Sequence, residues 1–238
     1  MNGRTLVAAA ALVALAAPAR AQRVPNDSGA AWLDRVALTL RYGALVPAGH
    51  SELFSLMDRA LDPGSRALRP RLAGGELHVR AAGAFGVVLG AASGGGTVAS
   101  VSRAQPLSGG AGTSQQTRLD LTTVGYVGAE LTALRWHGAR LAFDAGGGVA
   151  HYTLRQWGDF VDADRQVGFA QDFRSAGSGA FGYAGAGVEV PVRRWVALRG
   201  DVRRQVGSAP MSGDFAAFDR LDLGGTTFGA GLTLRRGR

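Results

Sequence analysis

The sequence predicts an all-β protein, an eight-stranded antiparallel up-and-down transmembrane β-barrel with a short helix in its first long loop. Three observations lead to this prediction. Apolar and polar residues alternate in eight separate segments, the connections between these segments are alternately short and long, and the chain begins like an exported protein. Alternation with a period of two indicates strands with one apolar and one polar face.

Residues 1–21 are interpreted as a secretory signal peptide that is cleaved after Ala21. Arg4 provides a positive start, residues 6–17 are apolar, and Ala19 and Ala21 place small side chains where a signal peptidase reads the chain. The apolar run is shorter than the roughly 20 residues that a membrane-spanning helix needs. We therefore expect residues 22–34 to form a polar N-terminal segment and residues 35–238 to form the barrel domain.

The composition excludes several classes of protein. The chain of 238 residues has no cysteine, which excludes disulfides and cysteine-metal sites. Its net charge is +8 and every basic residue is an arginine, but the arginines are scattered and the chain carries an export signal. These features argue against a nucleic-acid partner, which usually selects a clustered basic patch. The 37 glycines lie mostly within strand-like segments and indicate a crowded or strongly bent sheet.

The predicted strands cover approximately residues 35–43, 75–83, 86–103, 117–134, 139–157, 177–190, 195–206 and 218–236. In the fourth segment Leu119, Leu121, Val127 and Leu131 are expected to share one apolar face. In the eighth segment the apolar parity changes across Gly224-Gly225, which predicts a glycine bulge.

The alternation alone does not show whether the apolar face points inward, as in a soluble barrel, or outward to lipid. The connections favour lipid, because short ones near residues 82–85, 136–138 and 191–194 alternate with long ones at 44–72, 104–116, 158–176 and 207–217. Outer-membrane barrels have short periplasmic turns and long external loops in this order. The tryptophans lie near strand ends, where aromatic residues anchor at membrane interfaces: Trp32, Trp136 and Trp195 at the short turns and Trp157 opposite. A soluble exported β-barrel remains the structural alternative.

Several stretches carry a resemblance to a known superfamily. They are "DAGGGVAHYTL", "GYAGAGVEVPVRRWVALRGDVR" and the terminal "FGAGLTLRR". With them the chain resembles the small eight-stranded outer-membrane β-barrels of Gram-negative bacteria, the OmpA-, OmpX- and OmpW-like superfamily, in a barrel-only, porin-like form. This resemblance implies a place in the outer membrane of the cell envelope.

The chain departs from that superfamily at its end. Such barrels usually end in an aromatic residue that the insertion machinery recognises, whereas this chain ends at Arg238. Recognition would then use Phe228 or Leu234. No peptidoglycan-binding domain is expected after the last strand.

A set of charged residues shares the polar parity that would point into the lumen. They are Arg41, Glu76, His78, Arg80, Asp120, Glu130, Arg140, Asp144, Glu189, Arg199, Asp201 and Arg203. An eight-stranded barrel is just wide enough for side chains to fill, and buried charges must be paired to be tolerated. We expect a salt-bridged network that closes the bore, and the alternative is a gated polar channel.

Other polar residues give weaker signals for chemistry. Glu76 and His78 could be metal ligands or an acid–base pair, but a lone histidine is more often a hydrogen-bonded interior residue. His151 with Ser175 or Ser178 is the candidate base and nucleophile, although no spacing supports a triad. No catalytic residue, metal or cofactor is predicted.

Two of the long loops contain features of their own. Ser51 could cap a helix that ends before Pro63 and covers the barrel mouth, lies on the membrane or binds a partner. Asp159, Asp162 and Asp164 could collect a divalent cation among lipopolysaccharide phosphates, but their spacing does not match a calcium loop. They are interpreted as solvated loop charges.

Taken together, these features predict a non-enzymatic, monomeric outer-membrane barrel with a structural, adhesive or surface-interaction role. The alternatives are a narrow OmpW-like channel for small or apolar molecules and a lipid-modifying outer-membrane enzyme. The expected partners are outer-membrane lipid, lipopolysaccharide and, during biogenesis, the barrel-assembly machinery. Nothing in the sequence names a ligand.

Overall fold

A computed structural model describes residues 35–103, 113–162 and 167–235 of the chain. The predicted signal peptide and polar N-terminal segment lie outside the described residues, as does Trp32. Within the described part, no helix is long and apolar enough to cross a membrane.

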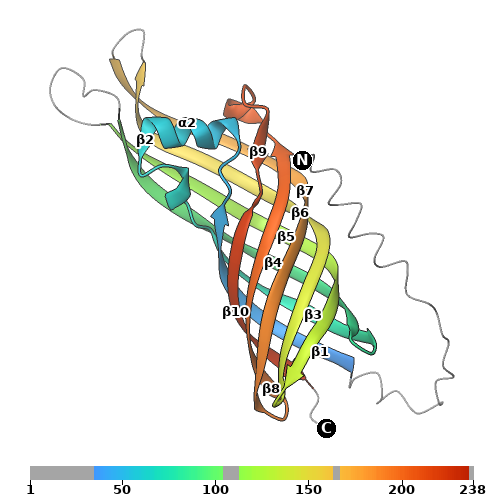
Figure 1. The fold of residues 1–238 in the computed structure, drawn as a ribbon. Helices are drawn as coiled ribbons and strands as arrows, with labels where there is room; N and C mark the ends of the chain where they lie inside the picture. Colours follow the sequence, from blue (N-terminus) through green and yellow to red (C-terminus); the bar gives the residue numbers. More distant parts are fainter. Residues whose placement is uncertain (1–34, 104–112, 163–166, 236–238) are drawn as a thin grey trace.

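The described chain is a closed ring of eight antiparallel strands (Figure 1). The ring strands are β1 (Val36–Pro47), β3 (Arg71–Ala82), β4 (Phe85–Ser102), β5 (Ser114–Trp136), β6 (Ala139–Asp162), β7 (Val167–Arg193), β8 (Val196–Pro210) and β10 (Gly225–Arg235). Each ring strand pairs with the next, and β10 pairs with both β8 and β1 to close the barrel. The predicted eight-stranded up-and-down fold is confirmed.

Several strands extend beyond the predicted segments, and the differences are greatest in two places. Strands β6 and β7 continue through most of the segment that was predicted as the long loop 158–176, and they form a tall hairpin. Within this hairpin the rings of Phe160 and Phe169 stack across the strands, with centroids 5.9 Å apart. The eighth predicted strand is divided into β9 (Arg220–Asp222) and β10, and the division falls beside Gly224, next to the predicted glycine bulge.

The two ends of the barrel differ. At one end, called here the turn end, tight turns join β3 to β4, β5 to β6 and β7 to β8. In the turn "HG" both residues have positive φ, 47° at His137 and 84° at Gly138. Positive φ at both central residues is typical of the type I′ turn, whose twist matches that of a β-hairpin.

The opposite end, called here the loop end, is covered by the predicted short helix (Figure 1). This helix, α2 (Glu52–Ala60), begins where the Ser51 hydroxyl accepts a hydrogen bond from the backbone N–H of Phe54 at 3.3 Å. Its residues Leu53, Phe54 and Met57 are buried in the same apolar core as the upper barrel. The helix therefore covers its own barrel. The short elements β2 (Leu61–Asp62), η2 (Ser65–Ala67), η3 (Gly213–Phe215) and β9 complete this end.

A belt of exposed apolar side chains surrounds the half of the barrel next to the turn end. It includes Leu38, Leu40, Tyr42, Leu77, Phe85, Val87, Leu89, Val127, Leu131, Phe143, Val149, Val188, Val190, Leu198, Val202, Val206, Phe228 and Leu232. On β6 the belt extends from the turn to Val149. About ten residues at a rise of about 3.3 Å and a tilt of about 40° give a height of about 25 Å. Outer-membrane barrels have an apolar band of that height.

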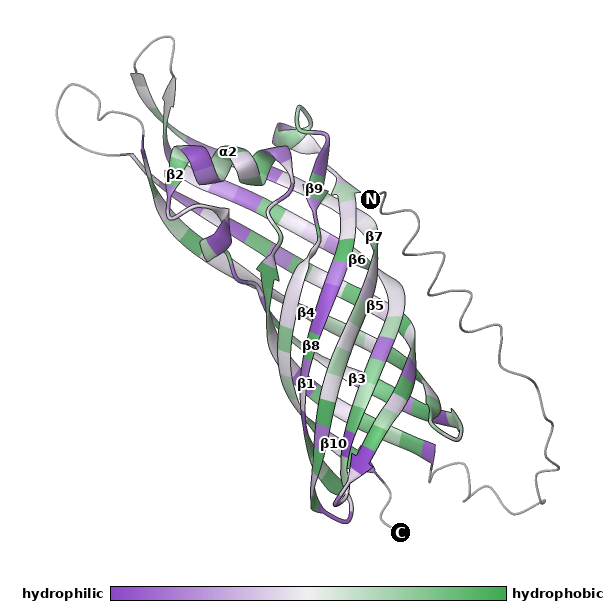
Figure 2. Ribbon diagram, viewed as in Figure 1, coloured by the Kyte–Doolittle hydropathy of each residue, from purple (hydrophilic) through white to green (hydrophobic). Residues whose placement is uncertain are grey.

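The distribution of apolar side chains reverses in the half next to the loop end. There the interior is apolar and the outer wall is polar. Hydrophobic and hydrophilic residues still alternate along the strands in both halves, but they face opposite sides of the wall (Figure 2). Strand β5 shows the reversal clearly, because Val127 is 52% exposed, whereas Leu119 and Leu121 are 2% and 3% exposed. The prediction that these residues share one face is wrong. A β-bulge between Leu121 and Thr123 shifts the alternation by one residue.

Candidate functional site

Charged side chains fill the bore inside the apolar belt. We call this set the lumen network, and its members are Arg41, Glu76, His78, Glu130, Arg140, Asp144, Glu189, Arg199, Asp201 and Arg203. These residues lie on β1, β3, β5, β6, β7 and β8, and β10 ends beside them at Arg235. They point into the bore because alternate residues of each strand face inward. The structure thus brings together ten of the charged residues for which the sequence predicts an inward position.

Glu76 is the most deeply buried carboxylate of the lumen network, at 1% exposure. The hydroxyl of Tyr126 donates to Glu76 Oε1 at 2.6 Å, and the guanidinium of Arg203 donates to the same oxygen. The other oxygen, Oε2, lies 3.2 Å from His78 Nε2. Glu76 therefore has a guanidinium and a hydroxyl donor at one carboxylate oxygen and an imidazole nitrogen beside the other.

Glu130 is a second centre of the network, nearer the turn end. Its carboxylate accepts hydrogen bonds from Arg140 Nη1 at 2.8 Å and from Arg199 Nη1 at 3.3 Å. His78 Nδ1 lies 3.1 Å from Glu130 Oε2, so the imidazole of His78 bridges the carboxylates of Glu130 and Glu76. This bridge connects the two centres into one network.

The network continues in both directions from these centres. Arg41 donates to both oxygens of Asp201, at 2.9 Å and 2.5 Å, in the bidentate geometry that favours strong pairing. Asp144 lies 2.8 Å from Arg203 Nε. Toward the turn end, Glu189 accepts from Arg140 at 3.1 Å and from Arg235 at 3.2 Å.

Inward glycines make room for these large side chains. A Cβ atom at Gly90 would lie 2.2 Å from the ring of Tyr126, and one at Gly229 would lie 2.6 Å from Arg41 Nε. Such distances are far shorter than any real contact, so the arginine and tyrosine side chains occupy space that only glycine leaves free. The high glycine content thus has a packing reason in the lumen.

One of the charged residues predicted for the lumen lies on the outer wall, and another lies at the mouth of the bore. The prediction for Asp120 is wrong: the residue faces outward and accepts a hydrogen bond from Arg118 at 2.7 Å. Asp120 lies beyond the β5 bulge, which reverses its face relative to Glu130. Arg80 keeps the predicted inward parity and lines the pocket at the mouth of the barrel.

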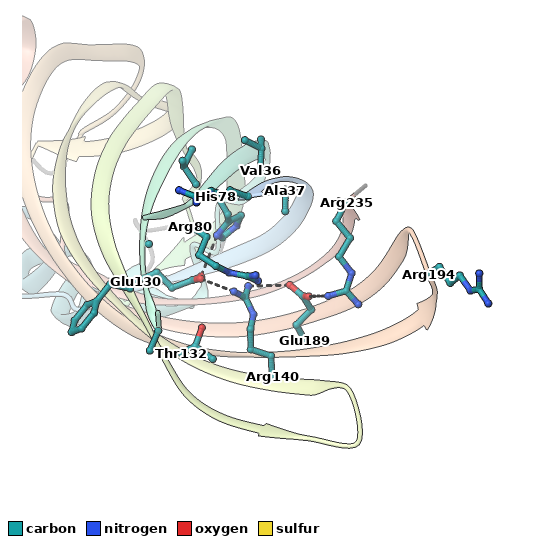
Figure 3. A pocket seen from close by; sticks show the side chains of 15 residues that line it. Val36, Ala37, His78, Arg80, Glu130, Thr132, Arg140, Glu189, Arg194 and Arg235 are labelled. Atoms are coloured by element: carbon teal, nitrogen blue, oxygen red, sulfur yellow. Dashed lines mark hydrogen bonds and ion pairs between the residues drawn. The ribbon is translucent and has the colours of Figure 1, made fainter. Parts of the chain in front are cut away.

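An open pocket of about 330 Å³ occupies the mouth at the turn end (Figure 3). Its lining includes Arg80, Arg140 and Arg235, and its inner wall is formed by His78 and Glu130. In Figure 3 the ion pairs from His78 through Glu130 and Arg140 to Arg235 cross the base of this pocket. The pocket is therefore a vestibule that ends at the lumen network.

Aromatic and aliphatic side chains pack inside the barrel above the network. Tyr126 and Tyr183 pack edge to face with centroids 5.6 Å apart, and the guanidinium of Arg203 lies 5.4 Å and 5.3 Å from their ring centroids. The apolar core and α2 follow toward the loop end. The sequence did not predict the two tyrosines of this layer or Arg235 as a partner of Glu189, although their inward parity was a usable signal.

The candidate base and nucleophile meet on the outer wall, just beyond the belt. His151 and Ser178 are opposite each other on β6 and β7, and Ser178 Oγ lies 2.5 Å from His151 Nδ1. Ser175 instead faces inward and bonds to the hydroxyl of Tyr152 at 3.1 Å. Within the described part of the chain no carboxylate interacts with His151, so the acid of a triad has no candidate there.

The candidate metal ligands do not form a site among the described residues. No group of three or more histidine or acidic side chains there has an arrangement that could hold a metal ion. The carboxylate of Glu76 and the imidazole of His78 are engaged in the lumen network. Asp164 lies outside the described residues, and Asp159 and Asp162 lie in the tall β6–β7 hairpin.

The fold and its lumen define a class: a closed eight-stranded β-barrel with an apolar outer belt and a charge-filled bore. The chain is similar to solved structures of outer membrane proteins. With OprG from Pseudomonas aeruginosa it shares 12% identity over 85% of this chain and 96% of that chain, with a TM-score of 0.42. With a major outer membrane protein from Thermus thermophilus the values are 14%, 84%, 99% and 0.43.

A third similar structure is Ail, the attachment invasion locus protein of Yersinia pestis, with 8% identity, coverage of 84% and 97%, and a TM-score of 0.40. No family model and no curated protein matches the chain.

Proposed function

We propose that the protein is a non-enzymatic, monomeric barrel of the bacterial outer membrane that acts through its outer surface and its loop end. The observation that carries this proposal is the belt of exposed apolar side chains about 25 Å tall around an ion-paired interior. A soluble barrel would have the opposite arrangement, with apolar side chains inside and charges in water. The expected signal peptide supports export.

The lumen network argues against a conduit as the main function. The network, the tyrosine layer and the apolar core follow one another along the bore, and α2 covers the loop end. Eight strands leave little space beyond their own side chains. We infer that the bore is closed and that contact with other molecules takes place on the outer wall and around the loop end.

The first test is to express the full chain in a Gram-negative host and compare boiled and unboiled outer-membrane fractions on SDS gels. A barrel in the outer membrane resists SDS until it is heated and then changes mobility. Planar-bilayer recordings of the purified protein should show no steady conductance. Protein in the soluble periplasmic fraction without a mobility shift would contradict the membrane location, and a steady open current would favour the channel.

A further inference from the structure

The vestibule at the turn end has a lining in which positive side chains outnumber negative ones. The acidic residues of the lining are Glu130 and Glu189, and the arginines are Arg35, Arg80, Arg140, Arg194 and Arg235. The lining comes from every ring strand except β8. The vestibule therefore opens along the bore and not through the apolar wall, so a ligand enters it from the water at the turn end.

The lumen network at the base of the vestibule does not take up this positive excess. Its four arginines together with Arg235 equal its five carboxylates in number, and ion pairs join the two sets. Glu130 and Glu189 belong to these five carboxylates, and each is only 4% exposed. Arg35 and Arg80 are exposed at the mouth and give it a net positive charge.

The rest of the turn end does not reverse this sign. In the tight turns and the strand ends beside them, Glu130 and Glu189 are again the acidic residues, while Arg135 and Arg193 add positive charge; these segments are 79–87, 130–142 and 188–197. In the sequence, the flanking residues 22–34 and 236–238 contain three arginines and two aspartates. A positive cleft with walls of low dielectric constant concentrates anions from the surrounding water.

The size of the vestibule suits a small organic anion. Its volume is about 330 Å³. At about 30 Å³ for each water molecule, this is the space of roughly ten waters, so a single inorganic anion would fill only part of it. Figure 3 shows Arg80, Arg140 and Arg235 pointing toward one another around Glu189, whereas Arg194 points away from them. An anion in the pocket would therefore meet several guanidinium groups at once.

Guanidinium groups from different strands favour a phosphate ester over a carboxylate. Arg80, Arg140 and Arg235 lie on β3, β6 and β10, so they approach an anion in the pocket from different sides. A carboxylate has two oxygens in one plane, which a single guanidinium fork can satisfy. A phosphate ester has three terminal oxygens that accept from several directions, and it carries up to two negative charges. The lining also includes Val79 and Phe85, which can contact the organic part of an ester.

We infer that the vestibule is a binding site for a small, soluble phosphate ester, and that Arg35 and Arg80 supply the positive charge that the bore does not neutralise. The planar guanidinium forks match phosphate oxygens in bidentate geometry. The bound ester would also relieve the repulsion among the arginines at the mouth. Short turns face the periplasm in outer-membrane barrels, so the ligand would come from that side. This origin rests on the proposed function, whereas the binding itself is measured on the purified barrel.

The test compares the full chain with two matched variants in neutral maltoside detergent, at low ionic strength so that charges are little screened. In the first variant Arg35 and Arg80 are replaced by Gln. In the second, the control, the exposed arginines Arg59 of α2 and Arg66 of η2 are replaced by Gln. Both variants lose two positive charges, but they lose them at opposite ends of the barrel.

The probe is glycerol 3-phosphate, and isothermal titration calorimetry measures its dissociation constant. We expect the first variant to bind the probe roughly tenfold more weakly than the parent chain, which corresponds to about 1.4 kcal/mol, and the control variant to match the parent chain. Glycerol should give no binding. Inorganic phosphate and succinate should bind the parent chain more weakly than the probe, because the first lacks the organic part and the second lacks the phosphoryl oxygens.

Several results would overturn the inference. They are no binding of the probe to the parent chain, equal affinity of the two variants, or binding of succinate or inorganic phosphate as tight as that of the probe. Tight binding of succinate would point instead to a site for acidic peptides. The SDS mobility shift is recorded for every chain, because a parent chain that forms no barrel would contradict the proposed function, while a formed barrel that does not bind the ester contradicts only this inference.

Discussion

Replacement of Glu130 by Gln should strongly destabilise the barrel while leaving its shape almost unchanged. Glu130 is 4% exposed and accepts from Arg140 at 2.8 Å and from Arg199 at 3.3 Å. Arg140 keeps a second carboxylate in Glu189, but Glu130 is the carboxylate that pairs with Arg199, whose side chain is 2% exposed. The substitution therefore removes the charge of the carboxylate that accepts a hydrogen bond from this buried guanidinium.

The expected loss can be bounded. Removal of one partner from a buried ion pair typically costs about 3–5 kcal/mol. Because the amide oxygen of glutamine still accepts a hydrogen bond, we expect a loss near the lower end, about 3 kcal/mol. The free energy of unfolding is measured by urea titration of the chain reconstituted in phosphatidylcholine vesicles, followed by tryptophan fluorescence.

A second variant separates charge from packing. In the double variant E130Q/R199M the guanidinium charge is removed as well, and most of the lost stability should return. The matched control is Asp120→Asn in the exposed pair with Arg118, where the loss should stay below about 1 kcal/mol. The reasoning is refuted if Glu130→Gln costs no more than the control, or if the double variant is less stable than the single one.

Three further predictions concern packing, the helix and catalysis. Gly90→Ala should lower the stability of the barrel by about 1–3 kcal/mol because the new Cβ meets the Tyr126 ring, whereas Gly125→Ala, where nothing lies within 4 Å, should be nearly neutral in the same urea titration. Ser51→Ala should cost about 1 kcal/mol at the start of α2, seen as faster amide exchange in that helix with unchanged exchange in the barrel strands. The His151–Ser178 pair should be non-catalytic, so the parent chain and Ser178→Ala should hydrolyse a p-nitrophenyl acyl ester at the same rate. Faster hydrolysis by the parent chain would favour the enzyme.

The fold could be predicted from the sequence because alternation with a period of two survives in at least part of each ring strand. Inward positions such as Glu76, Arg199 and Arg203 follow directly from that period once one reference residue is fixed. The pairing of specific partners does not follow, since His78 bridges Glu76 on its own strand and Glu130, which is 52 residues away. Such contacts depend on the stagger of the ring, which alternation does not encode.

Asp120 shows where the same reasoning fails. One extra residue in the β5 bulge reverses every side chain beyond it, so Leu119 joins the core and Asp120 points outward. The bulge leaves little trace in "LDLTTVGY", where threonine and glycine fit either face. The tall β6–β7 hairpin was not predicted for a related reason. Outside the belt the difference in hydrophobicity between the two faces of a strand is small, and the sequence of such a strand resembles that of a polar loop.

The closure of the ring has a consequence for how the chain folds. The hydroxyls of Thr39 and Thr233 meet at 2.9 Å inside the barrel, although 194 residues separate them along the chain. This contact and the β1–β10 hydrogen bonds form only when the first and last strands meet. The whole chain between these strands must therefore close into a loop before their pairing can stabilise the barrel. Assembly should therefore be slow. Opening should be slow as well if closure comes late on the pathway, because a finished ring offers no free edge from which to unzip.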